Sequence, residues 1–368
     1  MLRSNNLKIT IFGDICPVDG VKPFNVLVGE DEIVIGNLEC ALTDHPTPVT
    51  KAGPVLYNPE SFAASLKIWG FDAVSLANNH IRDCGDEGVR STLASCKKND
   101  ILTFGAGETE AEAAKPLIIE QNGLKVAFVS FSEREFNFVH NGKTGAVAFD
   151  PYVSLDIIRD LRKEVDALIV LYHGGIEYYM YPSPLLRKKC RKMVEAGADV
   201  VLCQHSHCIG TRERYGKGEI LYGQGNSLFG FRKGDDSWNH GLLAKLEVSE
   251  DGIKVKYDVL ETSKDDSVGL ASADVTKNVL SKMEKESAKL ADDAFLSESW
   301  KAFCRKQAPL YLAMTFGFGK NMNRLNRLLR NGLVRLLYNR LELNVTHNII
   351  RCDAHREVIE TILEDYEF

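Results

Sequence analysis

Hydrophobic runs of strand length alternate with helical patterns over the first two-thirds of the chain. The predicted strands are residues 9–12, 33–35, 73–76, 101–104, 126–131, 167–171 and 200–203. The helices predicted between them are residues 59–69, 87–97, 153–165 and 184–196. The strand runs are mostly continuous and rich in Val, Ile and Phe, which is typical of buried strands in a parallel sheet. The alternation therefore predicts an α/β fold.

The pattern changes after the seventh strand. An antiparallel meander is predicted from residues 219–221, 242–248 and 253–259. From about Ser263 the chain becomes polar, and helices are predicted at residues 274–290 and 295–311. We therefore expect an α/β domain over residues 1–262 and a helical C-terminal extension over residues 263–368.

Residues 320–340 combine basic side chains with a helical stripe of leucines. The basic residues are Lys320, Arg324, Arg327, Arg330, Arg335 and Arg340. A basic amphipathic helix can lie on an anionic membrane surface. A helix that packs on the core and extends its arginines into water has the same pattern, and this is the preferred interpretation. Peripheral contact with a membrane or a membrane-bound synthase is the alternative.

Short polar clusters follow most of the predicted strands. They are Gly13-Asp14, Asn37-Leu38-Glu39, Asn78-Asn79-His80, His173-Gly174-Gly175-Ile176-Glu177-Tyr178, Gln204-His205-Ser206-His207 and Gly225-Asn226. In open α/β sheets ligands bind at the carboxyl ends of the strands, so these clusters should meet. Carboxylates, side-chain amides and imidazoles suit a hard or borderline divalent cation. Together the clusters predict a metal-centred hydrolase site.

Side-chain direction supports this prediction at two of the clusters. Asn37 and Glu39 are two residues apart, as are His205 and His207. On an extended segment such pairs point to one side, so each pair can reach a single pocket. Asp14 can bind or bridge metals, although an Asp that caps a turn has the same sequence pattern.

The remaining clusters contain residues that are poor core material. Asn79 can offer a carbonyl oxygen to a metal, and the adjacent His80 can donate a proton to a reacting group. His173 precedes two glycines, and Glu177 and Tyr178 follow them. These two side chains could fix the tautomer of His173. Asn226 either closes the far rim of the site or belongs to a turn.

Composition narrows the class of protein. The chain has 368 residues with a net charge of -6, which argues against general nucleic-acid binding. Its nine cysteines contain no Cys-x-x-Cys pair, which is typical of reduced thiols. The N-terminal sequence enters the first predicted strand too soon for a secretory signal, so a cytoplasmic location is expected.

These clusters, in this order, resemble the bacterial capsule-synthesis family typified by the poly-γ-glutamate synthesis protein CapA. The resemblance covers about residues 8–229 and is most specific from His173-Gly-Gly-Ile-Glu-Tyr to Gln204-His-Ser-His. That family looks like a branch of the calcineurin-like metallophosphoesterases. The resemblance implies a four-layer α/β/β/α sandwich with a two-metal cage, here followed by the C-terminal extension.

The resemblance also implies residue roles. The implied metal ligands are Asp14, Glu39, Asn79, His173, His205 and His207, with His80 on the leaving group. Departures from the phosphoesterase pattern are Cys16 at the third position of the first motif, Asn37 in the altered second motif and Asn78 before Asn79. Cys16 could serve as a soft ligand for zinc, or that position could be empty. One or two divalent ions of Mn, Fe or Zn are therefore expected.

The leading hypothesis is a metal-dependent hydrolase linked to capsule or exopolymer biosynthesis. Metal-activated water would attack a small-molecule phosphoester or an amide, with His80 as the acid and Glu177 as the partner of His173. The alternative is a non-catalytic accessory protein that binds an acidic polymer or docks on a membrane-bound synthase through residues 320–340.

Overall fold

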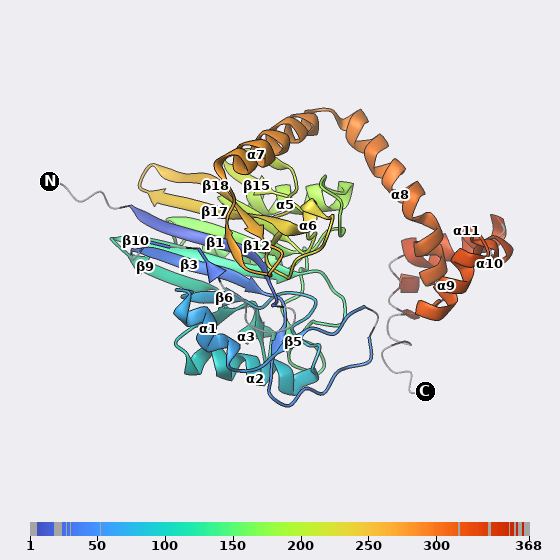
Figure 1. The fold of residues 1–368 in the computed structure, drawn as a ribbon, viewed down its shortest axis with the longest axis horizontal. Helices are drawn as coiled ribbons and strands as arrows, with labels where there is room; N and C mark the ends of the chain where they lie inside the picture. The colour runs from blue at the N-terminus through green and yellow to red at the C-terminus, as the bar shows by residue number, and fades with distance from the viewer. Residues whose placement is uncertain are drawn as a thin grey trace. The chain divides into compact units, whose positions relative to one another are not determined.

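The protein is a mixed α/β structure. The computed structural model describes residues 6–17, 24–26, 28–29, 31–51, 53–315, 317–337, 340–352, 354–356, 358–359 and 363. The chain forms two compact units, Met1–Leu296 and Ser297–Phe368. The first unit contains the sheets and the polar clusters (Figure 1). The domain boundary expected at residue 262 concerns independent folding and stays a prediction.

The larger sheet carries four of the polar clusters, those of Asp14, Glu39, Asn79 and Asn226. Its strand order is β2 (Phe24–Asn25), β19 (Val268–Leu270), β18 (Gly252–Thr262), β17 (His240–Ser249), β1 (Leu7–Ile15), β3 (Glu32–Leu38), β6 (Ala73–Ser75) and β7 (Leu102–Phe104), with β16 (Asn226–Leu228) also paired to β1. β1 runs parallel to β3 and to β16. The parallel register places Asp14 opposite both Asn37 and Asn226.

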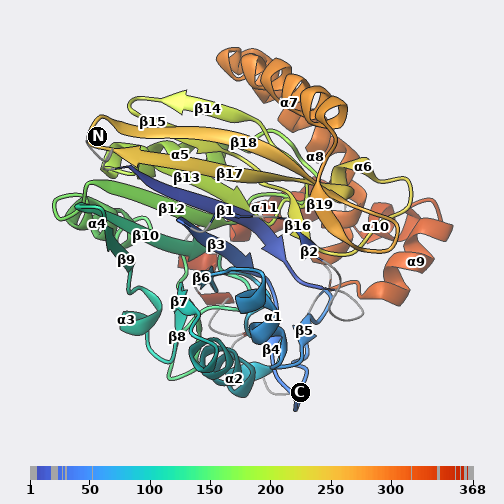
Figure 2. The ribbon, with the colours of Figure 1, turned by 60° about the vertical axis from the view of Figure 1, so that its left-hand side comes forward.

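The smaller sheet carries the clusters that contain His173 and the pair His205 and His207. Its strand order is β14 (Arg212–Tyr215), β15 (Gly218–Leu221), β13 (Val200–Gln204), β12 (Ala167–His173), β10 (Leu124–Ser132) and β9 (Leu117–Gln121) (Figure 2). Two short pairs complete the strands, β4 (Ala41–Leu42) with β5 (Tyr57–Asn58) and β8 (Ala106–Gly107) with β11 (Gly145–Ala146).

The hairpin of β17 and β18 confirms two strands of the predicted meander. The third assignment is wrong, because β15 lies in the smaller sheet, parallel to β13. All four residues of β15 are buried, which is typical of a strand covered on both faces. After β15 the chain crosses to the larger sheet, where β16 and β17 lie. The short spacing between residues 221 and 242 gives no sign of this change of sheet.

The two sheets share one buried apolar core. Ile9, Ile11 and Ile35 of the larger sheet belong to the same cluster as Phe128 and Leu171 of the smaller sheet. Because these aliphatic and aromatic side chains leave water together, their burial holds the sheets face to face. The carboxyl ends of β1, β3, β12 and β13 consequently meet at one edge.

Helices cover the outer face of each sheet. Those on the larger sheet are α1 (Phe62–Ile68) and α2 (Gly85–Lys98), and those on the smaller sheet are α4 (Ser154–Leu161) and α5 (Pro184–Ala196). Ser183 caps α5, since its Oγ accepts a hydrogen bond from Leu186 N–H at 3.1 Å. The other helices of this unit are the long α7 (Ala273–Ser287) and the short α3 (Glu110–Ala113), α6 (Asp236–Asn239) and η1 (Ala288–Ala291).

The second unit is helical. It contains most of α8 (Asp293–Thr315), then α9 (Lys320–Leu328), α10 (Gly332–Leu337) and α11 (Arg340–Arg351). The single basic helix predicted over residues 320–340 is therefore wrong. It is divided because Arg330 and Asn331 adopt positive φ angles of 50° and 63°, which interrupt a right-handed helix.

The leucines of this segment are largely exposed. Leu328 and Leu336 are 80% and 81% exposed, whereas Val334 is buried. The side chain of Arg340 lies outside the described residues. Contact of this segment with a membrane or a synthase stays a prediction. Among the helices of the described ranges, none has both the length and the apolar character needed to cross a bilayer.

Candidate metal centre

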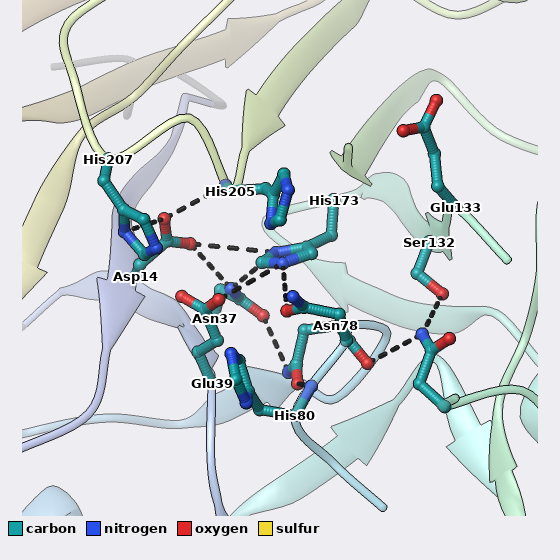
Figure 3. A network of polar contacts seen from close by, with 12 residues as sticks. Asp14, Asn37, Glu39, Asn78, His80, Ser132, Glu133, His173, His205 and His207 are labelled. Atoms are coloured by element: carbon teal, nitrogen blue, oxygen red, sulfur yellow. Dashed lines mark hydrogen bonds and ion pairs between the residues drawn. The ribbon is translucent and has the colours of Figure 1, made fainter. Parts of the chain in front are cut away.

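Five acidic and imidazole side chains from four strand ends converge at the shared edge of the two sheets (Figure 3). Two sets of three could each hold a metal ion: Glu39 with His173 and His205, and Asp14 with Glu39 and His207. Within each set, one ligand atom per residue lies within 4.8 Å of the others, and every member is buried. Glu39 belongs to both sets, as a carboxylate that bridges two ions would.

Asp14 is held in place at the end of β1. Its Oδ1 accepts a hydrogen bond from Asn37 Nδ2 at 2.8 Å, and its Oδ2 accepts one from the backbone N–H of His205 at 3.0 Å. The same carboxylate lies 3.8 Å from Nδ1 of His173 and 3.7 Å from Nδ1 of His207. Asn37 thus serves as a brace for Asp14, which follows from the parallel register of β1 and β3.

Glu39 is the least satisfied side chain in the site. It is fully buried, and neither carboxylate oxygen has a hydrogen-bond partner within the described part of the chain. Burial, with a further contribution from Asp14, raises the pKa of Glu39 well above its usual range. Buried charges in proteins are normally paired or coordinate metals. The unsatisfied oxygens therefore fit a cation at this position.

His173 and Asn79 approach Glu39 from the smaller and larger sheets. Nε2 of His173 lies 2.9 Å from Oδ1 of Asn79 and 3.3 Å from Oε1 of Glu39. Burial lowers the pKa of His173 to about 3, so its ring is neutral and can offer a lone pair. The three donor atoms are of the kinds that bind Mn, Fe and Zn.

His205 and His207 reach the site through a turn. The sequence predicted an extended segment, but their φ angles are 87° and 50°, in the left-handed region, because β13 ends at Gln204. Nδ1 of His205 has no hydrogen-bond partner among the described residues, and burial lowers the pKa of this ring. Nδ1 of His207 lies 2.8 Å from Oδ1 of Asn226. If Nδ1 donates there, Nε2 of His207 is left for a ligand.

The pKa of His207 is raised, whereas that of His205 is lowered. Burial lowers the pKa of His207, but the nearby carboxylates of Glu39 and Asp14 outweigh burial, so the net pKa is raised. The carboxylates of Glu39 and Asp14 thus favour a positive charge at the His207 ring. A bound metal ion would replace that attraction with coordination.

His80 is linked to a buried ion pair outside the two ligand sets. Its Nδ1 lies 2.6 Å from Oδ2 of Asp83 and 3.2 Å from Nζ of Lys51. Lys51 also pairs with Asp83 and donates to the carbonyl oxygen of Asn79 at 3.3 Å. Burial is the largest influence on His80 and lowers its pKa. If Nδ1 donates to Asp83, Nε2 is the atom left to exchange a proton.

Asn78 supports the backbone of this edge. Its Nδ2 donates to the carbonyl oxygen of Leu38 at 2.7 Å and to Oδ1 of Asn37 at 3.2 Å. Its own carbonyl oxygen accepts from Asn137 Nδ2 at 2.8 Å. These bonds tie the end of β6 to the end of β3.

Two sequence-predicted residues, Cys16 and Glu177, belong to neither ligand set. Cys16 is buried beside Cys40 and Asn58, and its hydrogen bond with Cys40, together with burial, raises the pKa of the Cys16 thiol, which favours the protonated form. Glu177 is exposed, and among the described contacts the ring nitrogens of His173 face other residues. The predicted Glu177–His173 contact is therefore not formed. Gly175, two residues before Glu177, adopts a positive φ of 109°.

Tyr178 is placed at the rim. Its side chain is 48% exposed, and its ring centroid lies 6.4 Å from that of His207. The hydroxyl accepts a hydrogen bond from Arg232 at 2.9 Å.

Three charged residues near the site were missed in the sequence. Asp83 follows His80 by three residues, a spacing that could have been noticed. Glu133 comes directly after β10, as the other clusters follow their strands, and it accepts from Gly175 N–H at 3.2 Å and from Lys189 at 2.7 Å. Lys51 lies in a loop without any local pattern, and only the fold brings it to Asp83.

The model of the family described as bacterial capsule synthesis protein PGA_cap matches residues 16–231, more than half of the chain. The chain belongs to the PGA_cap family. The match includes the predicted ligands from Glu39 to His207, whereas Asp14 lies two residues before it.

Individual relatives agree with the PGA_cap assignment. The capsule biosynthesis protein CapA of Bacillus anthracis is 29% identical over 208 residues, which cover 53% of this chain and 49% of the relative. The PGA biosynthesis protein CapA of Bacillus subtilis (strain 168) is 31% identical over 176 residues, covering 47% and 45%. The chain thus spans about half the length of these curated relatives.

A 5'-nucleotidase structure from Candida albicans SC5314 matches with a TM-score of 0.37 at 13% identity over 75% of this chain and 50% of that chain.

The lowered pKa of His173 predicts that its contribution to the stability of the metal-free PGA_cap protein falls at acidic pH. Its pKa falls from 6.5 to about 3 on folding, so the unfolded chain binds this proton more tightly. Its contribution therefore lowers the free energy of unfolding as the pH falls from about 6.5 toward about 3. Glu39 and His207, whose pKa values are raised, act in the opposite direction.

A comparison with His173→Gln isolates this contribution. Between about pH 6 and 4, the wild type should lose ~1.4 kcal/mol more per pH unit than the variant. Urea unfolding with a chelator present, repeated across this range, measures the difference. Parallel curves for the two proteins would contradict the prediction.

Proposed function

We propose that this PGA_cap protein is a metal-dependent hydrolase that acts on a phosphoester or related bond in capsule or exopolymer biosynthesis. We further propose that its two facing sheets and their outer helices form the four-layer α/β/β/α sandwich of the metallophosphoesterases. The observation that carries the proposal is Glu39, a buried carboxylate without hydrogen-bond partners among the described residues, shared by two candidate ligand sets.

The residues of the chain divide into holding and reacting groups. Asp14, Glu39, Asn79 and the three histidines of the ligand sets would hold the ions. Bound divalent ions supply Lewis acidity and a water molecule acidic enough to ionise near neutral pH. His80 lies beside this cluster with Asp83 at Nδ1, so Nε2 is its free ring nitrogen; once the ring has taken up a second proton there, it would give that proton to the leaving group.

The capsule link is supported by the names of the relatives, a capsule biosynthesis protein and a PGA biosynthesis protein. The sharing of Glu39 between two sets favours two ions per chain over one. The donor set of carboxylate, amide and imidazole suits Mn, Fe or Zn. The substrate would be a small phosphoester or a bond within an acidic polymer.

The test combines metal analysis with an assay. Protein purified without chelators should contain about two equivalents of metal and should hydrolyse bis(4-nitrophenyl) phosphate when loaded with Mn, Fe or Zn. His80→Ala should keep the metal but lose roughly 10²- to 10⁴-fold in rate, the usual contribution of a general acid. His45→Ala is the control, because His45 is exposed.

The outcomes separate the two hypotheses. Metal without hydrolysis of any phosphoester or amide would favour an accessory protein that binds an acidic polymer. Absence of metal after incubation with excess divalent ions would overturn the proposal.

A further inference from the structure

Arg232 is an exposed arginine that is fixed at both its backbone and its side chain. It lies between β16 and α6, where its N–H donates to Oδ1 of Asn239 at 2.8 Å and its carbonyl oxygen accepts from Nδ2 of Asn239 at 2.7 Å. The guanidinium lies over the ring of Trp238, with 3.0 Å from Cζ to the ring centroid. Nη1 donates to the hydroxyl of Tyr178 at 2.9 Å.

This arginine stands on the aromatic wall of the metal centre. The ring of Trp238 lies 4.9 Å from that of His207, and Tyr178 stacks on Trp238 at 6.3 Å. His207 belongs to the candidate ligand set of Asp14 and Glu39. Arg232 is thus separated from a candidate metal ligand by a single layer of aromatic rings.

The charge of Arg232 is not balanced by the chain. Within the described ranges, no carboxylate lies within ion-pair distance of its guanidinium. Other arginines do have such partners, among them Arg82, Arg162, Arg187, Arg191 and Arg212. Two nearby acids have other contacts: Oδ1 of Asp235 accepts from Trp238 N–H at 3.1 Å, and Oδ1 of Asp266 accepts from N–H of the adjacent Phe231 at 2.6 Å.

We propose that Arg232, with Tyr178 and Trp238, forms a subsite for a second anionic group of the substrate, a carboxylate or a phosphate distinct from the group at the metals. The inference rests on the proposed function and specifies its substrate as a molecule with at least two anionic groups. A guanidinium offers five N–H donors in a rigid fork that matches both kinds of oxyanion. Because the side chain is already held, little conformational entropy is lost on binding.

The experiment measures binding rather than turnover. The full chain, loaded with metal, is titrated by calorimetry with inorganic phosphate and separately with the peptide Glu-Glu-Glu. Arg232→Ala should weaken the probe that uses the subsite by roughly 10- to 100-fold, the usual effect of losing a charge-assisted hydrogen bond. Arg232→Lys should restore only part of the affinity, since lysine cannot form the fork.

Lys233→Ala is the matched control. Lys233 is the next residue, is also exposed, and carries the same charge, so it should change the affinity less than about twofold. A loss confined to phosphate assigns the subsite to phosphate, and a loss confined to the peptide assigns it to carboxylates. Equal losses in Arg232→Ala and Lys233→Ala, or no binding of either probe by the wild type, would overturn the subsite.

The same titrations, repeated with protein stripped of metal by a chelator and set beside the hydrolysis assay, separate this inference from the proposed function. Arg232-dependent binding in a protein that hydrolyses nothing would keep the subsite and reject the hydrolase. Hydrolysis of bis(4-nitrophenyl) phosphate, combined with probe affinities that do not depend on Arg232, would keep the hydrolase and reject the subsite.

Discussion

Glu39→Gln is expected to abolish metal binding and, at the same time, to raise the melting temperature of the metal-free protein. Glu39 is fully buried beside Asp14, and its oxygens have no hydrogen-bond partners within the described ranges. Because its pKa is raised well above the usual range, this carboxyl costs the metal-free fold free energy near neutral pH, whether it is ionised or protonated, and a bound cation would offset that cost. Glutamine has almost the same shape without the charge, so the metal-free fold should gain ~1–3 kcal/mol, equivalent to several degrees.

Asp14→Asn is the matched variant, because it also removes one carboxylate from the centre. Both oxygens of Asp14 accept hydrogen bonds, from Asn37 and from the N–H of His205. An amide would turn a donor toward one of these donors, so the metal-free protein should become less stable. The two variants should thus share the loss of metal and differ in the sign of the stability change.

Two measurements check the pair. Thermal unfolding in the presence of a chelator gives the stability of the metal-free proteins, and equilibrium titration with Mn or Zn gives affinity. Both variants should lose more than about 100-fold in affinity, since even an outer hydrogen-bond partner of a ligand contributes roughly 10- to 100-fold. A Glu39→Gln protein that melts below the wild type, or retains its metal, would contradict this account of Glu39.

The candidate ligands could be predicted because parallel strands impose a common edge. Asp14, Glu39 and His173 each follow a hydrophobic run, and the fold needs only to align those runs to bring the three together. The same rule would have found Glu133 after β10. The α/β class and the helical cover followed from the same alternation of apolar runs.

The rest depends on contacts that local pattern does not encode. Glu177 lies in the loop after β12, where Gly175 adopts a positive φ of 109° that the sequence shows only as a glycine. β15 could not be assigned to its sheet, because an apolar run does not identify its neighbour. Arg232 lies far along the chain from Tyr178, and its contact requires the crossing from one sheet to the other.

Asp83→Ala is expected to be among the most destabilising single changes at the site. The side chains of Lys51 and Asp83 are 3% and 1% exposed and form an ion pair. Asp83 also accepts from Leu56 N–H at 2.6 Å and contacts His80. Its removal leaves a buried ammonium group unpaired, which costs ~3–5 kcal/mol in comparable pairs.

A double-mutant cycle measures how much of this cost comes from the lost pairing of Lys51 with Asp83. Lys51→Met alone should be milder, because Asp83 keeps Leu56 N–H and His80 as donors. Lys51→Met combined with Asp83→Ala should recover part of the loss, since no buried charge is then left unpaired. Urea unfolding of the wild type and the three variants gives the coupling energy. Additive losses would mean that Lys51 and Asp83 do not act as a pair.

The same variants separate stability from chemistry at His80. Neither Lys51 nor Asp83 belongs to a candidate ligand set, so both single variants should retain metal. Without Asp83 the Nδ1 proton of His80 loses its acceptor, and the ring is no longer held with Nε2 toward the cluster. Asp83→Asn, which keeps an acceptor oxygen, should retain more activity than Asp83→Ala. Equal activity in the two would show that Asp83 acts on the fold and not through His80.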